Sequence, residues 1–277
     1  MIDFFVMERL LRIARRPLAV VSLLATALAA AAALAAGPAP ANPPPPALDE
    51  GVFVISSGGQ RLGTEDFALR VLRDSLCLAS VSIMVQDDGS GRRDTVDKRV
   101  FMAVGKDDRL LHVYQSTLLY RGSTTVRGIV VIPGDTVFSL YREYEGRGSG
   151  DRLVMPPGRM FVMDSRLFSL IDYVTLTLAG QSFDRRPISV LALGERDTIV
   201  ETIVARVGRD SVRSGSRVLA ATHMRMIQGP ITFDLWVDSK GRLLRLEHAP
   251  SGLLVERRPP AAVKPRAATP PAKKPGG

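Results

Sequence analysis

The strongest constraint on the fold of this chain is an alternation of apolar and polar residues that recurs between short turn segments. In residues 231–237, apolar side chains occupy every second position. A period of two places these side chains on one face of a β-strand and their neighbours on the other. Clusters of Gly, Asp, Ser and Pro between the alternating stretches are typical of turns. The clearest turns are at residues 57–59, 87–91, 105–108, 133–135, 229–230 and 239–241.

We therefore expect residues 49–258 to form a mainly β domain of about twelve antiparallel strands. A sheet of this size must close or curl, because flat edges would expose unpaired backbone groups. The predicted fold is one curved antiparallel sheet or an incomplete barrel, with at most one short helix. The alternation leaves open whether its interior is packed or hollow.

The alternation is interrupted at residues 153–179. The segment Pro156-Pro157-Gly158 cannot lie in a central strand. Apolar residues at 167, 170, 171, 174 and 178 follow at helical spacing, behind an N-cap at Asp164 or Ser165. We predict one short helix that runs into a strand, with roughly seven strands before the interruption and five or six after it.

The first 36 residues have the order of an export signal. Four arginines at positions 9–16 precede a charge-free run at 18–36, and Ala33-Leu34-Ala35 matches a signal-peptidase site. The run approaches the roughly 20 residues that span a bilayer, but its alanines make insertion weak, about −2 to −4 kcal/mol. We predict that residues 1–36 are a signal peptide or a membrane anchor, which places the protein in the periplasm or cell envelope. If the segment is not cleaved, residues 18–36 contact the membrane.

Two low-complexity segments flank the domain. Residues 37–48 are predicted to be a proline-rich linker, and residues 259–277 a disordered basic tail of Pro, Ala and Lys. The chain has a formal net charge of +9, but residues 49–258 carry 29 Lys+Arg and 26 Asp+Glu, a net of only +3 (29 − 26). Interspersed charges of both signs predict a solvated surface and no nucleic-acid binding.

The sequence contains no evident catalytic or metal-binding motif. None of its three histidines has a second His or Cys at zinc-site spacing, so we expect no metal, no cofactor and no enzymatic activity. Residues 146–151 place Asp151 where a dinucleotide loop needs its third glycine, and we expect a flexible loop there. The single cysteine, Cys77, excludes an intrachain disulfide and is expected to be a small buried apolar residue.

One carboxylate falls on an apolar face. Glu65 has the same parity as Phe67 and Leu69, which are expected to point inward. A buried carboxylate must be paired, hydrogen-bonded or protonated. Two interpretations stay open: a polar anchor inside a ligand cavity, or a salt bridge with an arginine at the end of the strand.

Two hairpin motifs resemble those of a known group of proteins. Residues 53–55 (FVI) and 63–69 (GTE-x-F-x-L) are similar to the first hairpin of uncharacterised bacterial periplasmic domains, and residues 233–246 (FDLWVD-x-KGRLLRL) resemble their last hairpin. Those domains are akin to the lipoprotein-carrier proteins, whose fold is a curved, incomplete β-barrel around a hydrophobic cavity closed by helices. The resemblance covers roughly residues 50–257. It implies a lipid or acyl-chain ligand on the concave apolar faces. The basic tail and the scarcity of helix depart from that pattern.

We therefore expect an exported, non-enzymatic envelope protein whose curved sheet binds a lipid or other apolar ligand. Alternatively, the inward apolar residues fill a solid core, and the protein is a structural or scaffold module that pairs with another envelope protein. The residues expected to line a binding site are Glu65, Phe67, Leu69, Phe101, Phe138, Met224, Phe233 and Leu235.

Overall fold

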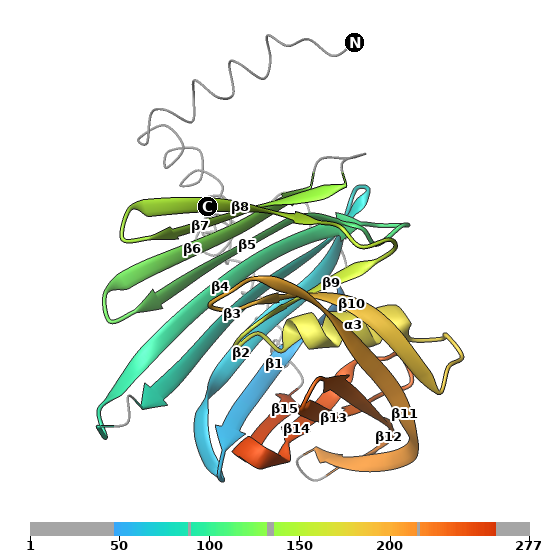
Figure 1. Cartoon of the computed structure of the whole chain (residues 1–277). Helices are drawn as coiled ribbons and strands as arrows, with labels where there is room; N and C mark the ends of the chain where they lie inside the picture. The colour runs from blue at the N-terminus through green and yellow to red at the C-terminus, as the bar shows by residue number, and fades with distance from the viewer. Residues whose placement is uncertain (1–46, 88–89, 132–135, 215–216, 259–277) are drawn as a thin grey trace, which may run out of the picture. The chain divides into compact units, whose positions relative to one another are not determined.

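A computed structural model describes residues 47–87, 90–131, 136–214 and 217–258 (Figure 1). The predicted signal or anchor (1–36), nearly all of the linker and the tail (259–277) lie outside the described residues. The elements are β1 (Ala47–Ser57), β2 (Gln60–Leu72), β3 (Ser75–Asp87), β4 (Arg93–Gly105), β5 (Leu111–Tyr120), β6 (Ser123–Val131), β7 (Val137–Tyr144), β8 (Arg147–Val154), β9 (Met160–Asp164), α3 (Ser169–Leu178), β10 (Arg185–Leu193), β11 (Thr198–Ser214), β12 (Arg217–Gln228), β13 (Ile231–Val237), β14 (Leu243–His248), a 3₁₀ turn (Ala249–Ser251) and β15 (Leu253–Arg258). Within these ranges, no helix has both the length and the apolar character needed to cross a membrane.

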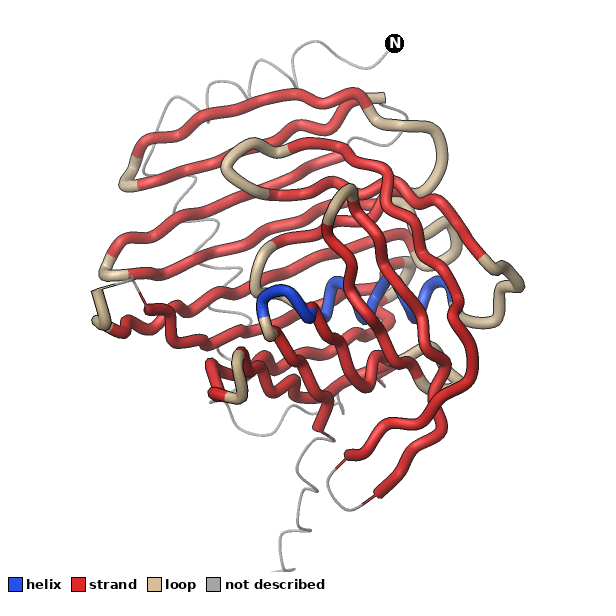
Figure 2. Tube along the Cα trace, turned by 60° about the horizontal axis from the view of Figure 1, so that its bottom comes forward, coloured by secondary structure: helices blue, strands red, loops and turns tan. Residues whose placement is uncertain are grey.

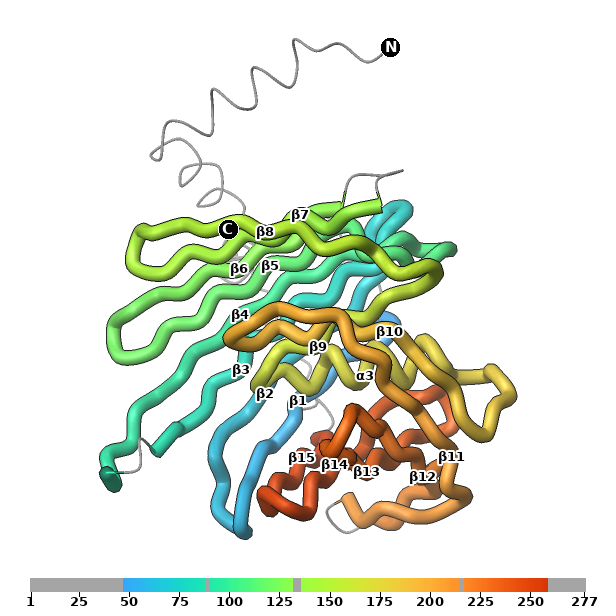
Figure 3. The backbone as a smooth tube through the Cα atoms, viewed as in Figure 1, coloured from blue at the N-terminus to red at the C-terminus, as the bar shows by residue number. Residues whose placement is uncertain are grey.

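The fifteen strands form one curled sheet, in the order β8-β7-β6-β5-β4-β3-β2-β1-β15-β14-β13-β12-β11-β10-β9. Neighbouring strands are antiparallel except for the parallel pair β9 and β10. The two edge strands, β8 and β9, are consecutive in the chain and are joined only by residues 155–159, as Figure 3 shows. A linker of this length spans at most about 20 Å, so the sheet must curl until its edges approach each other. The predicted curved, mainly antiparallel sheet is thus confirmed, although it has fifteen strands instead of about twelve.

Tight turns set the pairing of the N-terminal strands. Arg121-Gly122 joins β5 to β6 and Glu145-Gly146 joins β7 to β8, and all four residues have positive φ. Two-residue turns of this kind match the twist of a hairpin and fix its register. The second turn makes β8 from residues 147–154, so the prediction of a flexible loop at 146–151 was wrong.

The predicted order of helix and strand after the proline segment was also wrong. The strand β9 comes first, and Asp164 ends it instead of capping a helix. The helix α3 begins at Ser169, behind an N-cap at Phe168, and continues through the residues that we expected to form a strand. Because parallel strands need a crossover connection, α3 is the crossover between β9 and β10. Nine strands precede the helix and six follow it.

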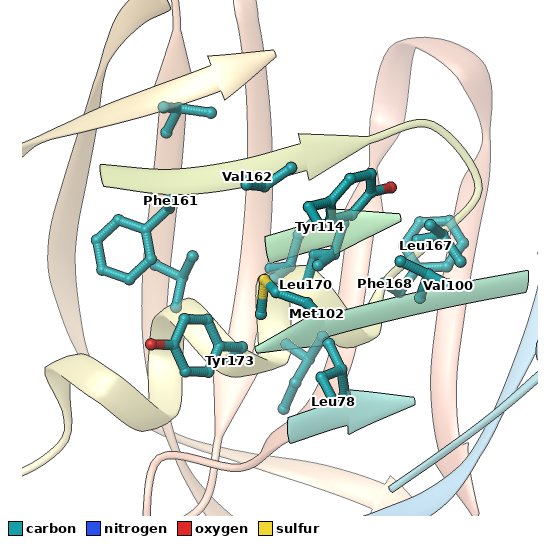
Figure 4. Close-up of a cluster of buried hydrophobic side chains, with 14 of the residues drawn as sticks. Leu78, Val100, Met102, Tyr114, Phe161, Val162, Leu167, Phe168, Leu170 and Tyr173 are labelled. Carbon is teal, nitrogen blue, oxygen red and sulfur yellow. The ribbon is translucent and has the colours of Figure 1, made fainter. Parts of the chain in front are cut away.

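The helix α3 fills the interior of the curled sheet. Figure 2 shows it surrounded by strands, and its side chains are buried on nearly every side. Figure 4 shows Leu170 and Tyr173 of α3 in one cluster with Met102 of β4 and Phe161 of β9. All of these residues belong to one hydrophobic core. The concave face of the sheet is therefore packed against a helix over this region.

Candidate functional site

Glu65 binds the N-terminus of the helix. Its carboxylate is fully buried and accepts hydrogen bonds from the backbone N–H groups of Phe168 at 2.6 Å and Ser169 at 3.1 Å, and from Ser80 Oγ at 2.6 Å. The first N–H groups of a helix have no partner within the helix, and a carboxylate also complements the helix dipole. Glu65 thus replaces the missing N-cap side chain. Of the two interpretations left open by the sequence, the salt bridge with an arginine is not what satisfies its carboxylate.

A second buried polar cluster lies on the same concave face. Lys98 of β4 forms an ion pair with Asp164 at the end of β9, and both side chains are almost completely buried. Lys98 Nζ also donates to the Ser165 carbonyl oxygen at 2.9 Å. Asp164 Oδ2 accepts from Tyr114 Oη at 2.6 Å and from Ser116 Oγ at 3.2 Å. The cluster joins the strands β4 and β5 to the end of β9.

This cluster forms the base of an open pocket of about 230 Å³. One wall comes from β4, β5 and β6, and the other from the carboxyl ends of the parallel strands β9 and β10. Leu193 and Asp164 pair directly at those two ends. Crevices at the carboxyl ends of parallel strands are common places for ligands. The lining residues are Lys98, Ser116, Leu118, Thr125, Arg127, Asp164, Ser165, Arg166, Leu193, Gly194 and Glu195.

The pocket is rich in hydrogen-bond donors and cations. Lys98, Arg127 and Arg166 line it together with three hydroxyl-bearing residues, and the carboxylates of Asp164 and Glu195 also line it. The pKa of Lys98 is lowered from its usual value, mainly by burial. The carboxylate of Asp164 opposes this shift, and the cations Arg127 and Arg166 add to it. Burial, with the negative charge of Asp164 beside it, raises the pKa of Tyr114 well above its usual value. Tyr114 therefore acts as a neutral donor to Asp164.

Two of the cations are held in place by hydrogen bonds to uncharged oxygens, and Arg127 also forms an ion pair with Asp197. Arg127 Nη2 donates to the Gly194 carbonyl oxygen at 2.8 Å, and its other terminal nitrogen lies 3.8 Å from Asp197. Arg166 donates to the side-chain oxygen of Gln86. Lys98 donates two of its three N–H groups to Asp164 and to the Ser165 carbonyl oxygen. The arrangement can therefore bind an anionic group with the guanidinium groups positioned in advance.

A third buried cluster anchors the middle of α3. Asp172 accepts a hydrogen bond from the Leu243 N–H at 2.6 Å and lies 3.6 Å from the Arg257 guanidinium, which also pairs with Asp49. Burial, followed by hydrogen bonding to Asp49, raises the pKa of Asp172 well above its usual value, although Arg257 opposes the shift. Arg257 also lies over the rings of Phe53 and Phe67. This cluster lines none of the pockets described here and acts within the core.

Another pocket, of about 310 Å³, lies at the C-terminal end of α3. Its charged residues are bound to neighbours: Arg206 donates to the Gln181 carbonyl oxygen at 2.6 Å, and Asp238 forms an ion pair with Arg242. No buried charged side chain lines it. We therefore take the pocket of Lys98, Arg127 and Arg166 as the candidate site.

Most of the predicted lining residues belong to the core, and one of them, Met224, also lines the pocket of about 310 Å³. Phe101 lies outside the core, on the outer face, and is 43% exposed, whereas its neighbours Val100 and Met102 point inward. Five consecutive apolar residues at 100–104 conceal the alternation in this strand, and the prediction that Phe101 faces inward was wrong. The residues that do face inward are Glu65, Phe67, Leu69, Phe138, Met224 and Leu235, which are buried, and Phe233, which is partly buried against the core.

Cys77 and the histidines have ordinary surroundings. Cys77 lies on the outer face of β3 and is only half-buried, so the prediction that it is buried was wrong. His223 lies 2.7 Å from Asp234 and stacks on Trp236, and His248 lies 2.7 Å from Ser251. Across the described ranges, no three His, Cys, Asp or Glu side chains are grouped closely enough to hold a metal ion.

Lys98, Arg127, Asp164 and Arg166 were not among the residues predicted to line a site, and Asp164 was predicted only as a helix cap. Lys98 carried a usable signal, because it shares the parity of the buried residues Val96 and Val100. The others come from strands and loops that only the tertiary fold brings together.

Comparison with known proteins supports the architecture. No protein-family model and no curated protein matches the sequence. The structure is similar to the crystal structure of a β-barrel-like protein from Brucella abortus, a domain of unknown function named DUF1849. The two share a TM-score of 0.54 and 7% sequence identity over 76% of this chain and 95% of the other. At this identity the likeness concerns the fold alone, and the chain has a β-barrel-like fold.

Proposed function

We propose that this protein is an exported, non-enzymatic component of the cell envelope that binds the anionic group of an amphiphile in the pocket lined by Lys98, Arg127 and Arg166. The observation that carries the proposal is the convergence of these three cations, one of them buried, on an open pocket. Charge-assisted hydrogen bonds from Arg and Lys to carboxylate or phosphate oxygens are strong and directional. The leader-like segment at residues 1–36 supports export.

The size and lining of the pocket favour a headgroup over a whole acyl chain. A volume of about 230 Å³ is below the usual range for sites that enclose a complete drug-sized ligand. Leu118 and Leu193 add apolar surface beside the cations, which suits the region where a headgroup meets its chain. An apolar ligand deep in the curl would have to displace α3, whereas a headgroup in this pocket would not.

The hydrogen bonds of Asp164 support binding over catalysis. Its two oxygens accept from Lys98, Tyr114 and Ser116, which occupy three of the roughly four acceptor positions of a carboxylate. A catalytic acid or base must reach its substrate directly. Lys98 and Asp164 instead hold the two walls of the pocket together.

Calorimetric titration with short-chain lipids tests the proposal. We expect dihexanoyl phosphatidylglycerol to bind and dihexanoyl phosphatidylcholine to bind far more weakly. Arg127→Gln removes one cation of the pocket and should weaken binding by roughly tenfold or more. Arg99→Gln makes the same charge change on the outer face and serves as the control. Competition by inorganic phosphate distinguishes a free anion from a lipid headgroup as the ligand.

The binding proposal fails if phosphatidylglycerol does not bind, or if Arg127→Gln and Arg99→Gln behave alike. Export is tested separately by fractionating cells and measuring the mass of the product. Cleavage after Ala35 with recovery from the envelope supports the localisation, and a full-length product in the cytosol refutes it.

A further inference from the structure

The edge strand β8 is open to solvent along its length. It is the terminal strand of the sheet, at its upper border in Figure 1, and seven of its eight residues are exposed. Among the described strands, β7 is its one neighbour in the sheet. An edge strand presents a row of unpaired N–H and C=O groups, which another chain can extend by strand pairing.

The tight turn shows which backbone groups face outward. Tyr144 and Arg147 close the two-residue turn Glu145-Gly146, and such a closing pair exchanges hydrogen bonds within the hairpin. Because the pattern alternates, residues 147, 149, 151 and 153 bond toward β7. The N–H and C=O groups of Gly148, Gly150, Arg152 and Val154 therefore point to the open edge.

The side chains along this edge are complementary to themselves. Arg147 pairs with Tyr144 and Asp151 pairs with Leu140, and both of these β7 residues have the parity of the buried Phe138. Arg147 and Asp151 therefore lie on the concave side of the strand, with Ser149 midway between them. Neither forms an ion pair within the described residues. Their charges are opposite, whereas an edge protected by charges of one sign would repel a second copy of itself.

The outer side of the edge offers little obstruction. Gly148 and Gly150 occupy two of the outward-bonding positions, and the ring of Tyr141 lies so close to Gly148 that a Cβ there would be 3.1 Å from the phenolic oxygen. An aromatic ring over an edge glycine stabilises a strand that lacks side chains of its own. The backbone thus stays in strand geometry while its edge stays accessible.

We propose that two copies of this chain pair in antiparallel fashion along β8, around a two-fold axis at Ser149. In this register Gly148 of each copy bonds to Gly150 of the other, so the outward-bonding groups match. Arg147 of each copy then lies directly opposite Asp151 of the other, and the symmetry makes this contact twice. Centring the axis on Gly148 or Gly150 would place both charges opposite other residues. This self-association is independent of the headgroup site.

Charge reversal gives a self-contained test by analytical ultracentrifugation of the purified protein. Arg147→Asp and Asp151→Arg each turn both attractions into repulsions and should raise the dimer dissociation constant by roughly tenfold. Mixing the two variants opposes aspartates to arginines at both contacts, so a heterodimer should form with wild-type affinity. The double variant R147D/D151R should likewise associate with itself. Both positions are exposed, and circular dichroism confirms that each variant is folded.

A disulfide tests the position of the axis. Ser149→Cys in a Cys77→Ser background should form a disulfide-linked dimer on mild oxidation, because directly opposite residues of a non-hydrogen-bonded pair lie about 4.5 Å apart. Arg152→Cys is the control, since two copies of that residue would be about 20 Å apart. A wild-type protein that stays monomeric at every concentration refutes the proposal. So does equal association of Arg147→Asp, Asp151→Arg and their mixture.

Discussion

Replacing Glu65 with leucine should lower the free energy of unfolding by about 2–4 kcal/mol. The substitution leaves the buried N–H groups of Phe168 and Ser169 without an acceptor, at about 1–3 kcal/mol each. It also relieves the desolvation of a buried carboxylate, which offsets part of this loss. Ser80 can rotate its hydroxyl and contributes less. Glu65→Gln keeps the shape and one acceptor oxygen, so its loss should be smaller, at about 1–2 kcal/mol.

The pH dependence of these variants separates the charge from the hydrogen bonds. Burial raises the pKa of Glu65, although hydrogen bonds from Ser80 and the helix N-terminus oppose the shift. A carboxyl group whose pKa is raised on folding binds more protons in the folded state. Its contribution to stability is fully present below about pH 4.5, the ordinary value, and is lost as pH rises through the folded pKa. Glu65→Gln should therefore flatten the decline in stability with rising pH.

Urea unfolding followed by Trp236 fluorescence, at a series of pH values, measures both effects. Glu201→Gln is the matched control, because Glu201 is exposed on β11. The helix-anchoring role of Glu65 is wrong if Glu65→Leu is as stable as Glu201→Gln. The pKa argument is wrong if Glu65→Gln and the wild type show the same pH slope.

Three further substitutions test the packing of α3. Asp172→Asn keeps the acceptor for Leu243 but removes an acid whose pKa is raised, so it should reduce the fall in stability as pH rises above 4; an unchanged slope in urea unfolding would contradict this. Leu170→Ala empties fully buried volume and should cost about 2–5 kcal/mol by thermal or urea unfolding; a loss below 1 kcal/mol would mean that the interior is loosely packed. Gly241→Ala forces a Cβ to 2.6 Å from Ala179 Cβ at a φ of +83° and should destabilise the protein by about 2–4 kcal/mol. The control Gly59→Ala, at a φ of +79° with open space around it, should cost only about 1 kcal/mol, and equal losses would contradict the steric argument.

The antiparallel sheet was predictable because most strands are half-buried and alternate visibly. Two strands, β8 and β9, were not predicted, for different physical reasons. In β8, Gly148 and Gly150 have no side chains, so the alternation is absent, and the strand depends on pairing with β7. In β9 nearly all residues are buried on both faces of the sheet. Its five residues are four apolar residues and one aspartate, so they show no alternation of apolar and polar positions. The helix itself was detectable, but its order relative to the strand depends on the parallel pairing with β10.

The candidate site was less predictable than the fold, because its residues come together only through the curl. Glu65 and Lys98 share one signal, a charged residue at an inward position, and both lie in one cross-strand row of the concave surface, with Ser82 of β3 between them. That signal says that a charge is buried but does not identify its partner. Glu65 accepts hydrogen bonds from a helix N-terminus about 100 residues further along the chain, and Lys98 forms an ion pair with Asp164 at the end of β9.

The three buried clusters explain how a curled sheet holds one helix in one position. Apolar contacts alone would let α3 slide or rotate inside the curl at little cost, because dispersion and burial are not directional. Glu65 fixes its first turn to β2, Asp172 fixes its middle to β14 and β15, and Lys98 fixes the preceding strand to β4. A shift of α3 by one residue would break these contacts and leave charges buried without partners, at several kcal/mol each. Of these contacts, the Lys98–Asp164 ion pair also joins the two walls of the candidate pocket, so a polar pair that orders the core also gives the pocket its shape.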